Sequence, residues 1–281
     1  MNKTYRIIWN KVRNCLMVVG ENAKSQGKGA SNKKPLVNAV ASALLALGGS
    51  YALADTIIID TQTNQQQVLG NGQSIFVDST GSIVVGSDAV VVPMGSSVGG
   101  ITNAGWIIAD TNGIVVVQST LTGGINNSGV ISGTFVAGVN IVENVAFFGG
   151  LNNTGEIISL SDIGIFLGPD VTLNGGITNS GSVYGGSVGI FAAQSTLTGG
   201  INNSGLISGG WWGVLSFEST LTDGITNSGS ISGKYSGIVA DGSSLTGGIN
   251  NSGSISGGRY GIRATQSSLT GGITNSGSIS G

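Results

Sequence analysis

Apolar positions recur along residues 99–281 with a spacing that does not suit a helix. One column of apolar positions comprises Ile101, Ile125, Leu151, Ile177, Ile201, Ile225, Ile249 and Ile273. A second column, six residues later, comprises Ile107, Ile131, Ile157, Val183, Ile207, Ile231, Ile255 and Ile279. The segments between glycines are short and rich in β-branched residues, which predicts short strands separated by glycine bends.

The same units carry a repeated glycine block. GGITNAG at 99–105 is followed by seven similar copies, such as GGINNSG, and the eight copies start at 99, 123, 149, 175, 199, 223, 247 and 271. Successive starts are therefore 24, 26, 26, 24, 24, 24 and 24 residues apart. A unit of this length can bury its isoleucines only by stacking on the next unit. The pattern predicts an all-β parallel β-helix (β-solenoid) of about 24-residue coils.

Each block contains an asparagine two residues after the first apolar position, which places it on the same, inward face. These residues are Asn103, Asn127, Asn153, Asn179, Asn203, Asn227, Asn251 and Asn275. We expect them to form a structural ladder in which side-chain amides hydrogen-bond from coil to coil. A metal-binding array is the less favoured alternative, because neutral amides without nearby carboxylates are poor cation ligands.

Residues 55–98 lack the block but contain strand-like stretches, namely Thr56–Ile59, Ser74–Val77, Ile83–Val85 and Ala89–Val92. We interpret 55–98 as an N-terminal cap and the first coils, followed by the solenoid repeats of 99–281. A cap would protect the open strand edges at this end of the rod.

The first 54 residues differ from the rest in charge. Eight of the 11 basic residues lie within the first 34, whereas residues 55–281 carry three basic and 12 acidic residues, a balance of 3 − 12 = −9. A lysine cluster precedes an apolar run over 35–47, which is typical of a secretory signal peptide and too short to span a bilayer. The small residues Ala52 and Ala54 predict signal cleavage before Asp55. The acidic remainder argues against a nucleic-acid partner.

The segment in front of the signal peptide has its own motifs. Its opening, MNKTYRIIWN, and the later VVGENAK resemble the extended signal peptide region of Gram-negative type V secretion proteins, the autotransporters. The glycine block is similar to the right-handed β-helical passenger domains of autotransporter adhesins. These resemblances imply an extended signal peptide over 1–54, with a helical signal segment, and a right-handed solenoid after it.

The resemblance also implies partners and a location. It implies the Sec export machinery and signal peptidase, an outer-membrane β-barrel translocator, and passenger display at the cell surface or release outside the cell. Adhesion to a host or bacterial surface protein or glycan, aggregation, biofilm formation and virulence are the expected roles. The sequence shows no alternating barrel strands at its end, so we expect a truncated autotransporter.

Little in the sequence favours catalysis. The chain has no histidine, and its single cysteine, Cys15, lies in the leader, so common triads, disulfides and histidine metal sites are excluded. No cofactor or metal is expected. The acidic residues occupy differing repeat positions and lack basic partners before Lys234. A polysaccharide-degrading β-helix, and a stalk for an effector domain outside this sequence, remain as alternatives to a non-enzymatic adhesive stalk.

The most variable tract of the repeat lies just before the Gly-Ile pair. When the units are aligned, its last three copies predict a ridge of aromatic and basic side chains, formed by Trp211, Trp212, Lys234, Tyr235, Arg259 and Tyr260. Aromatic faces beside cations suit stacking on sugars or contact with a protein partner. The alternative is that these rings only cover a bend and shield the stack beneath.

Overall fold

The computed structural model describes residues 5–10, 15–20 and 55–281. The chain divides into two units, Met1–Ser50 and Tyr51–Gly281. In the first unit, strands β1 (Tyr5–Asn10) and β2 (Cys15–Gly20) pair antiparallel, with Tyr5 opposite Gly20. Both segments contain β-branched or aromatic residues, which favour strands. The apolar run of the helical signal segment (35–47), Ala52 and Ala54 lie outside the described residues, and Asp55 is exposed.

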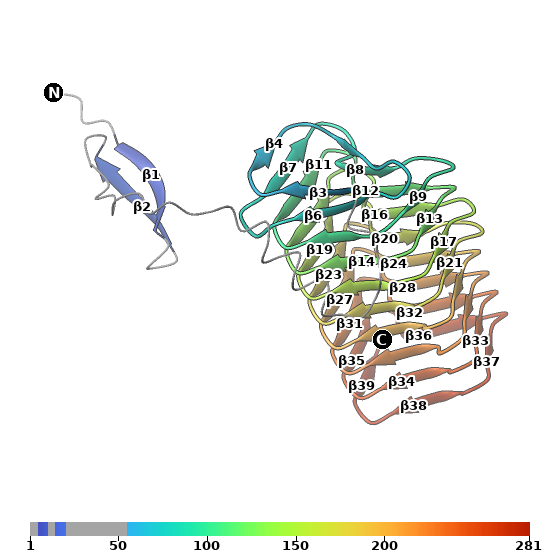
Figure 1. The fold of residues 1–281 in the computed structure, drawn as a ribbon. Coiled ribbons are helices and arrows are strands. Elements are labelled where there is room, and N and C mark those ends of the chain that lie inside the picture. Colours follow the sequence, from blue (N-terminus) through green and yellow to red (C-terminus); the bar gives the residue numbers. More distant parts are fainter. Residues whose placement is uncertain (1–4, 11–14, 21–54) are drawn as a thin grey trace. The chain divides into compact units, whose positions relative to one another are not determined.

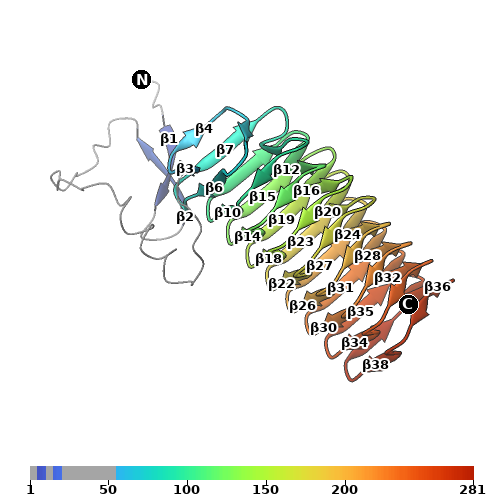
Figure 2. The same ribbon diagram turned by 45° about the vertical axis from the view of Figure 1, so that its right-hand side comes forward.

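Four parallel sheets make up the second unit (Figures 1 and 2). Sheet I contains β3 (Thr56–Ile59), β6 (Ser74–Val77), β10 (Ile101–Asn103), β14 (Ile125–Asn127), β18 (Leu151–Asn153), β22 (Ile177–Asn179), β26 (Ile201–Asn203), β30 (Ile225–Asn227), β34 (Ile249–Asn251) and β38 (Ile273–Asn275). Sheet II contains β4 (Gln62–Thr63), β7 (Ser82–Val85), β11 (Trp106–Ala109), β15 (Val130–Gly133), β19 (Glu156–Ser159), β23 (Ser182–Gly185), β27 (Leu206–Gly209), β31 (Ser230–Gly233), β35 (Ser254–Gly257) and β39 (Ser278–Ser280).

The other two sheets complete each turn. Sheet III contains β5 (Gln67–Val68), β8 (Val90–Val92), β12 (Asn112–Val117), β16 (Ala137–Val142), β20 (Ile163–Leu167), β24 (Val188–Ala193), β28 (Trp212–Phe217), β32 (Ser236–Asp241) and β36 (Tyr260–Thr265). Sheet IV contains β9 (Ser97–Val98), β13 (Thr120–Leu121), β17 (Ala146–Phe147), β21 (Thr172–Leu173), β25 (Thr196–Leu197), β29 (Thr220–Leu221), β33 (Ser244–Leu245) and β37 (Ser268–Leu269).

The chain visits sheets I to IV in order and then repeats the circuit, so each winding lies on the one before it (Figure 2). We number the windings from the N-terminal end: winding 1 is β3–β5, winding 2 is β6–β9, winding 3 is β10–β13, and winding 9 is β34–β37. Repeat-equivalent residues pair directly, as Ile101 does with Ile125. The parallel β-solenoid predicted from the repeat is therefore confirmed.

Aliphatic columns fill the interior of the solenoid. The first column is at most 1 % exposed from Ile101 to Ile249, and the second is fully buried from Ile107 to Ile255. Burying one such side chain contributes roughly 1.5–3 kcal/mol, a gain that exists only when windings stack. Residues 56–98 join the same columns as windings 1 and 2, where Ile75 and Ile83 are buried.

Glycines in the block allow the close approach of windings. From the second copy of the block onward, its second residue is a glycine with a left-handed backbone, for example φ +77° at Gly124, which glycine adopts without steric cost. At Gly129, a Cβ atom would overlap the carbonyl oxygen of Gly105 in the winding before it. The surplus residues of the two longer units lie in bends, at 134–136 and 143–145 in the first and at 160–162 and 168–171 in the second, so the strands keep their register.

No helix in the described part of the chain is long and apolar enough to cross a membrane.

Candidate functional site

The repeated asparagines lie in one column at the end of the sheet I strands. Asn103 donates from Nδ2 to Asn127 Oδ1 at 2.8 Å, and Asn127 donates in turn to Asn153 Oδ1 at 2.7 Å. The pattern continues without interruption through Asn179, Asn203, Asn227, Asn251 and Asn275, at 2.7–2.8 Å. The column is buried as far as Asn251.

Each amide also holds the bend that follows its strand. Asn127 Nδ2 donates to the carbonyl of Gly129, two residues on, and to the carbonyl of Glu156 in the next winding. The side chain therefore adds a second donor to the Gly129 carbonyl, which also accepts from the Glu156 N–H, and it ties the bend to the next winding. Among the described residues, no group of three or more His, Cys, Asp or Glu side chains could hold a metal ion. The contacts of the column are those of a structural element.

The predicted ridge lies where the chain passes from sheet II to sheet III. Residues 211, 235 and 259 are vertical neighbours, because Tyr235 N donates to Trp211 O at 2.9 Å and Arg259 N to Tyr235 O at 3.0 Å. Trp212, Ser236 and Tyr260 pair in register in β28, β32 and β36. Trp211 is 51 % exposed and Tyr260 37 % exposed, whereas Ser236 is buried.

Cations and rings contact one another along this ridge. Lys234 Nζ lies 5.8 Å from the centroid of the Trp211 ring. The Arg259 guanidinium lies 5.5 Å from the Tyr235 ring and 5.2 Å from the Tyr260 ring, and its Nη1 donates to the Tyr235 hydroxyl. This hydrogen bond and the charge interactions with Tyr235 and Tyr260 raise the pKa of Arg259 above its ordinary value. The groups that raise this pKa are the two tyrosines and include no carboxylate. The described contacts of Arg259 therefore leave its charge without an acidic partner.

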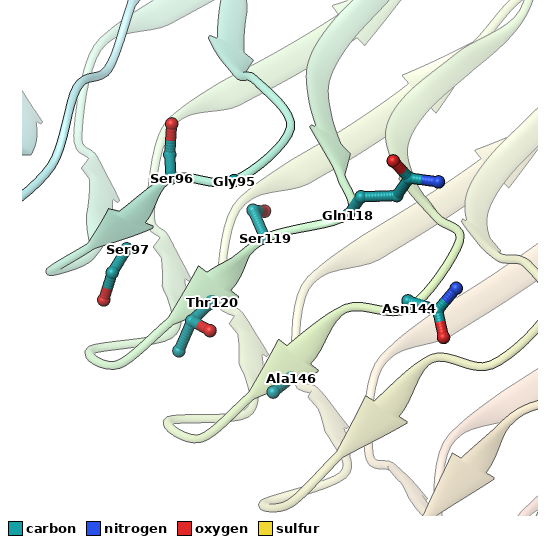
Figure 3. A pocket seen from close by; sticks show the side chains of 8 residues that line it. All are labelled: Gly95, Ser96, Ser97, Gln118, Ser119, Thr120, Asn144 and Ala146. Atoms are coloured by element: carbon teal, nitrogen blue, oxygen red, sulfur yellow. The ribbon is translucent and has the colours of Figure 1, made fainter.

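The acidic residues are distributed over several edges of the solenoid. Glu143 and Glu218 lie at bends between sheets III and IV, where they accept hydrogen bonds from Gln118 (3.0 Å) and Gln194 (2.8 Å). A hollow at the same side of the solenoid is polar and contains no acidic or basic side chain (Figure 3). Its lining residues are Gly95, Ser96, Ser97, Gln118, Ser119, Thr120, Asn144 and Ala146.

One group of surface residues was not assembled by sequence reasoning. The bends between sheets II and III, which we call the II–III edge, comprise Asp88, 110–111, 134–136, 160–162, 186–187, 210–211, 234–235 and 258–259 in windings 2 to 9. Besides the ridge, this edge bears the exposed side chains of Phe135 and Leu160 and the acidic residues Asp88, Asp110 and Asp162. The sequence feature that could have indicated this edge is the variation of its tract from unit to unit, in contrast to the nearly constant glycine block.

The aliphatic and asparagine columns of the solenoid both link successive windings. The family model of the extended signal peptide of type V secretion systems matches residues 1–50. Searches of curated proteins and of solved structures gave no match. The matched leader and the β-solenoid together fit an autotransporter passenger. The leader points to export through a Gram-negative type V system, and therefore to Sec export and a translocator as partners in general.

Proposed function

We propose that the chain is an adhesive stalk, exported and presented outside the bacterial cell, which contacts its target through the ridge of windings 7 to 9. The proposal is supported by the type V leader together with exposed aromatic side chains that carry cations without carboxylate partners. Aromatic and arginine side chains are enriched at binding surfaces, so a group of exposed rings and cations suits contact with a target. The aliphatic and asparagine columns build the rod that holds the ridge.

The β-solenoid favours a structural role over catalysis. Within residues 55–281 the acidic side chains are distributed over several edges of the solenoid, and the lining of the hollow beside Gln118 consists of hydroxyl, amide and small side chains, with no acidic or basic side chain among them. Adhesion, aggregation or biofilm formation requires only a repeated, rigid and exposed contact surface, and the stacked windings supply one.

Trp211 offers a sharp test because the chain contains a matched control. Trp106, in β11, is 52 % exposed and Trp211 is 51 % exposed, but Trp106 lies on the face of sheet II in winding 3, away from the ridge. The full chain is exported with its own leader, purified and immobilised, and its adhesion to host cells, to bacterial cells and to glycans is measured. Trp211→Ala combined with Arg259→Ala should reduce adhesion at least about tenfold, as loss of contact residues usually does. Trp106→Ala should leave adhesion unchanged.

Circular dichroism checks that both variants keep the solenoid. Equal adhesion of the folded ridge variant and the unsubstituted protein would contradict the proposal. Turnover of a polysaccharide by the purified protein would favour the enzymatic alternative instead.

A further inference from the structure

Charge is segregated along the II–III edge. Its N-terminal windings carry Asp88 (winding 2), Asp110 (winding 3) and Asp162 (winding 5) and no basic residue. Its C-terminal windings carry Lys234 (winding 8) and Arg259 (winding 9) and no acidic residue. The edge is therefore acidic over its first half and basic at its far end.

These opposite charges are too far apart to pair within one molecule. Asp162 and Lys234 are three windings apart, about 14 Å, and Asp110 and Lys234 are five windings apart, about 24 Å, at one strand spacing per winding. Salt screens exposed charges beyond about 8–10 Å under ordinary conditions. The observed contacts of Lys234 and Arg259 are with rings and a hydroxyl group.

Exposed apolar side chains lie in windings 4, 5 and 7 of the same edge. Phe135 (winding 4) is 63 % exposed, Leu160 (winding 5) 61 % and Trp211 (winding 7) 51 %. Winding 6 contributes the small residues Gly186 and Ser187 at the same edge. The edge thus has an apolar middle with space beside it, which suits close contact with another surface.

We infer that the partner of this edge is a second copy of the same chain, lying antiparallel with winding n of one copy beside winding 11 − n of the other. This register places Arg259 beside Asp88, Lys234 beside Asp110, and Trp211 beside Phe135. The twofold axis passes between windings 5 and 6, where Leu160 of each copy meets Gly186 of the other. Because each contact occurs twice, the assembly is a closed, isologous dimer. The inference rests on the proposed function, since it names the target of the adhesive ridge.

Other registers form fewer of these ion pairs and apolar contacts between the two copies. A shift by one winding in either direction keeps one of the two ion pairs and places Trp211 beside Asp110 or Lys234 beside Phe135. A parallel arrangement pairs both Lys234 and Arg259 with aspartates only when the copies are staggered by six windings, which leaves few windings in contact and generates an open filament. Asp88 suits an ion pair as well, because its three hydrogen bonds, from Thr111 and Asn112, all use Oδ1.

Charge reversal with rescue tests the register. The full chain is exported with its own leader, and its dimerisation is measured by sedimentation over a range of concentrations and salt. Lys234→Asp alone and Asp110→Lys alone should each weaken the dimer about tenfold, because each places like charges together in both copies. The double variant Lys234→Asp with Asp110→Lys should return to within about threefold of the starting affinity. Raised salt should weaken the unsubstituted dimer.

A chemical cross-link provides an independent measurement that does not depend on charge. In a Cys15→Ser background, Ser161→Cys near the twofold axis should form a dimer with a short bismaleimide. Ser96→Cys, in the hollow between sheets III and IV, should not. Sedimentation as a monomer at all concentrations, filaments in place of dimers, or failure of the double variant to recover would each overturn the inference.

The outcomes separate this inference from the proposed function. A monomer whose ridge still holds cells or glycans would refute the second copy and leave the adhesive ridge standing. An anionic glycan as the target would appear as binding that Lys234→Asp abolishes and Asp110→Lys does not restore. A monomer without any ridge-dependent adhesion would refute both.

Discussion

Asn203 and Asn227 are 24 positions apart, yet Asn203 donates a side-chain hydrogen bond of 2.7 Å to the side chain of Asn227. The bond links winding 7 to winding 8 at the end of sheet I. Because Asn179 donates to Asn203 in the same way, each amide is both donor and acceptor in a continuous buried row. Such a row fixes the register of neighbouring windings, since a shift of one residue would leave every amide unpaired.

Removal of one amide should therefore be costly. Asn203→Ala deprives the buried Asn179 amide of its acceptor and removes the hydrogen bond that Asn203 donates to Asn227, and we expect a loss of about 1–3 kcal/mol in the free energy of unfolding. The adjacent Asn202→Ala is the control, because Asn202 lies on the exposed face of β26 and should change stability by less than about 0.5 kcal/mol. Urea denaturation of both variants measures the difference. Equal losses would contradict an inward-facing amide row.

Two adjacent isoleucines of β19 provide a matched test of the aliphatic columns. Ile157 is fully buried between windings, whereas Ile158 points to the other face and is half-buried. Ile157→Ala should cost about 2–5 kcal/mol through lost burial and the cavity left behind. Ile158→Ala should cost clearly less in the same denaturation experiment. A reversed order would mean that β19 presents its opposite face to the core.

Excision of a whole winding should be tolerated. Starts of the glycine block at 199 and 223 differ by 24 residues, so deletion of 199–222 joins equivalent positions of neighbouring windings. Each winding contacts mainly its neighbours, and the shortened protein should keep its strand content and cooperative unfolding. Deletion of 199–210, half a winding, should break the register and expose the core. Circular dichroism and protease resistance distinguish the two, and equal behaviour would contradict nearest-neighbour stacking.

The absence of histidine from the whole chain predicts a flat pH dependence near neutrality. Histidine is the side chain that ordinarily changes charge between pH 5 and 8. The pKa of Arg259 is raised above its ordinary value, because the folded state favours the charged guanidinium. The resulting contribution to the free energy of unfolding is fully present at every pH below the ordinary arginine pKa, so it does not change between pH 6 and 8. The melting temperature should be constant between pH 6 and 8. A melting temperature that changes with pH in that interval would contradict this prediction, because it would require an ionisable group that titrates there.

Most of the fold can be predicted from the repeat in the sequence. Ile101 and Ile125 occupy equivalent positions of successive units, and the pairing of such positions follows from the period alone. The inward position of Asn103 follows equally, because alternate residues of a strand share a face. By contrast, the antiparallel pairing of β1 with β2 does not follow from the repeat, because both strands lie in the leader, where no unit recurs.

The ridge was predicted in part. Vertical order of Trp211, Tyr235 and Arg259 follows from the alignment of units. The placement of Arg259 between two tyrosine rings does not, because it depends on side-chain rotamers that the period leaves free. Asp88, Asp110 and Asp162 occupy differing repeat positions and therefore look scattered in the sequence. Only the bends, which absorb insertions, bring them to one edge.

Distances along one exposed column test the stacking of windings most directly. Spin labels replace Asn126 and, in turn, Asn202, Thr226 or Asn250, which are equivalent exposed positions of sheet I three, four and five windings away. With Cys15→Ser as the background, pulsed electron paramagnetic resonance should give label separations that rise from about 14 Å to about 19 Å and about 24 Å, one strand spacing per winding. Separations that do not increase by that step, or that fail to follow the order of the windings, would contradict the solenoid.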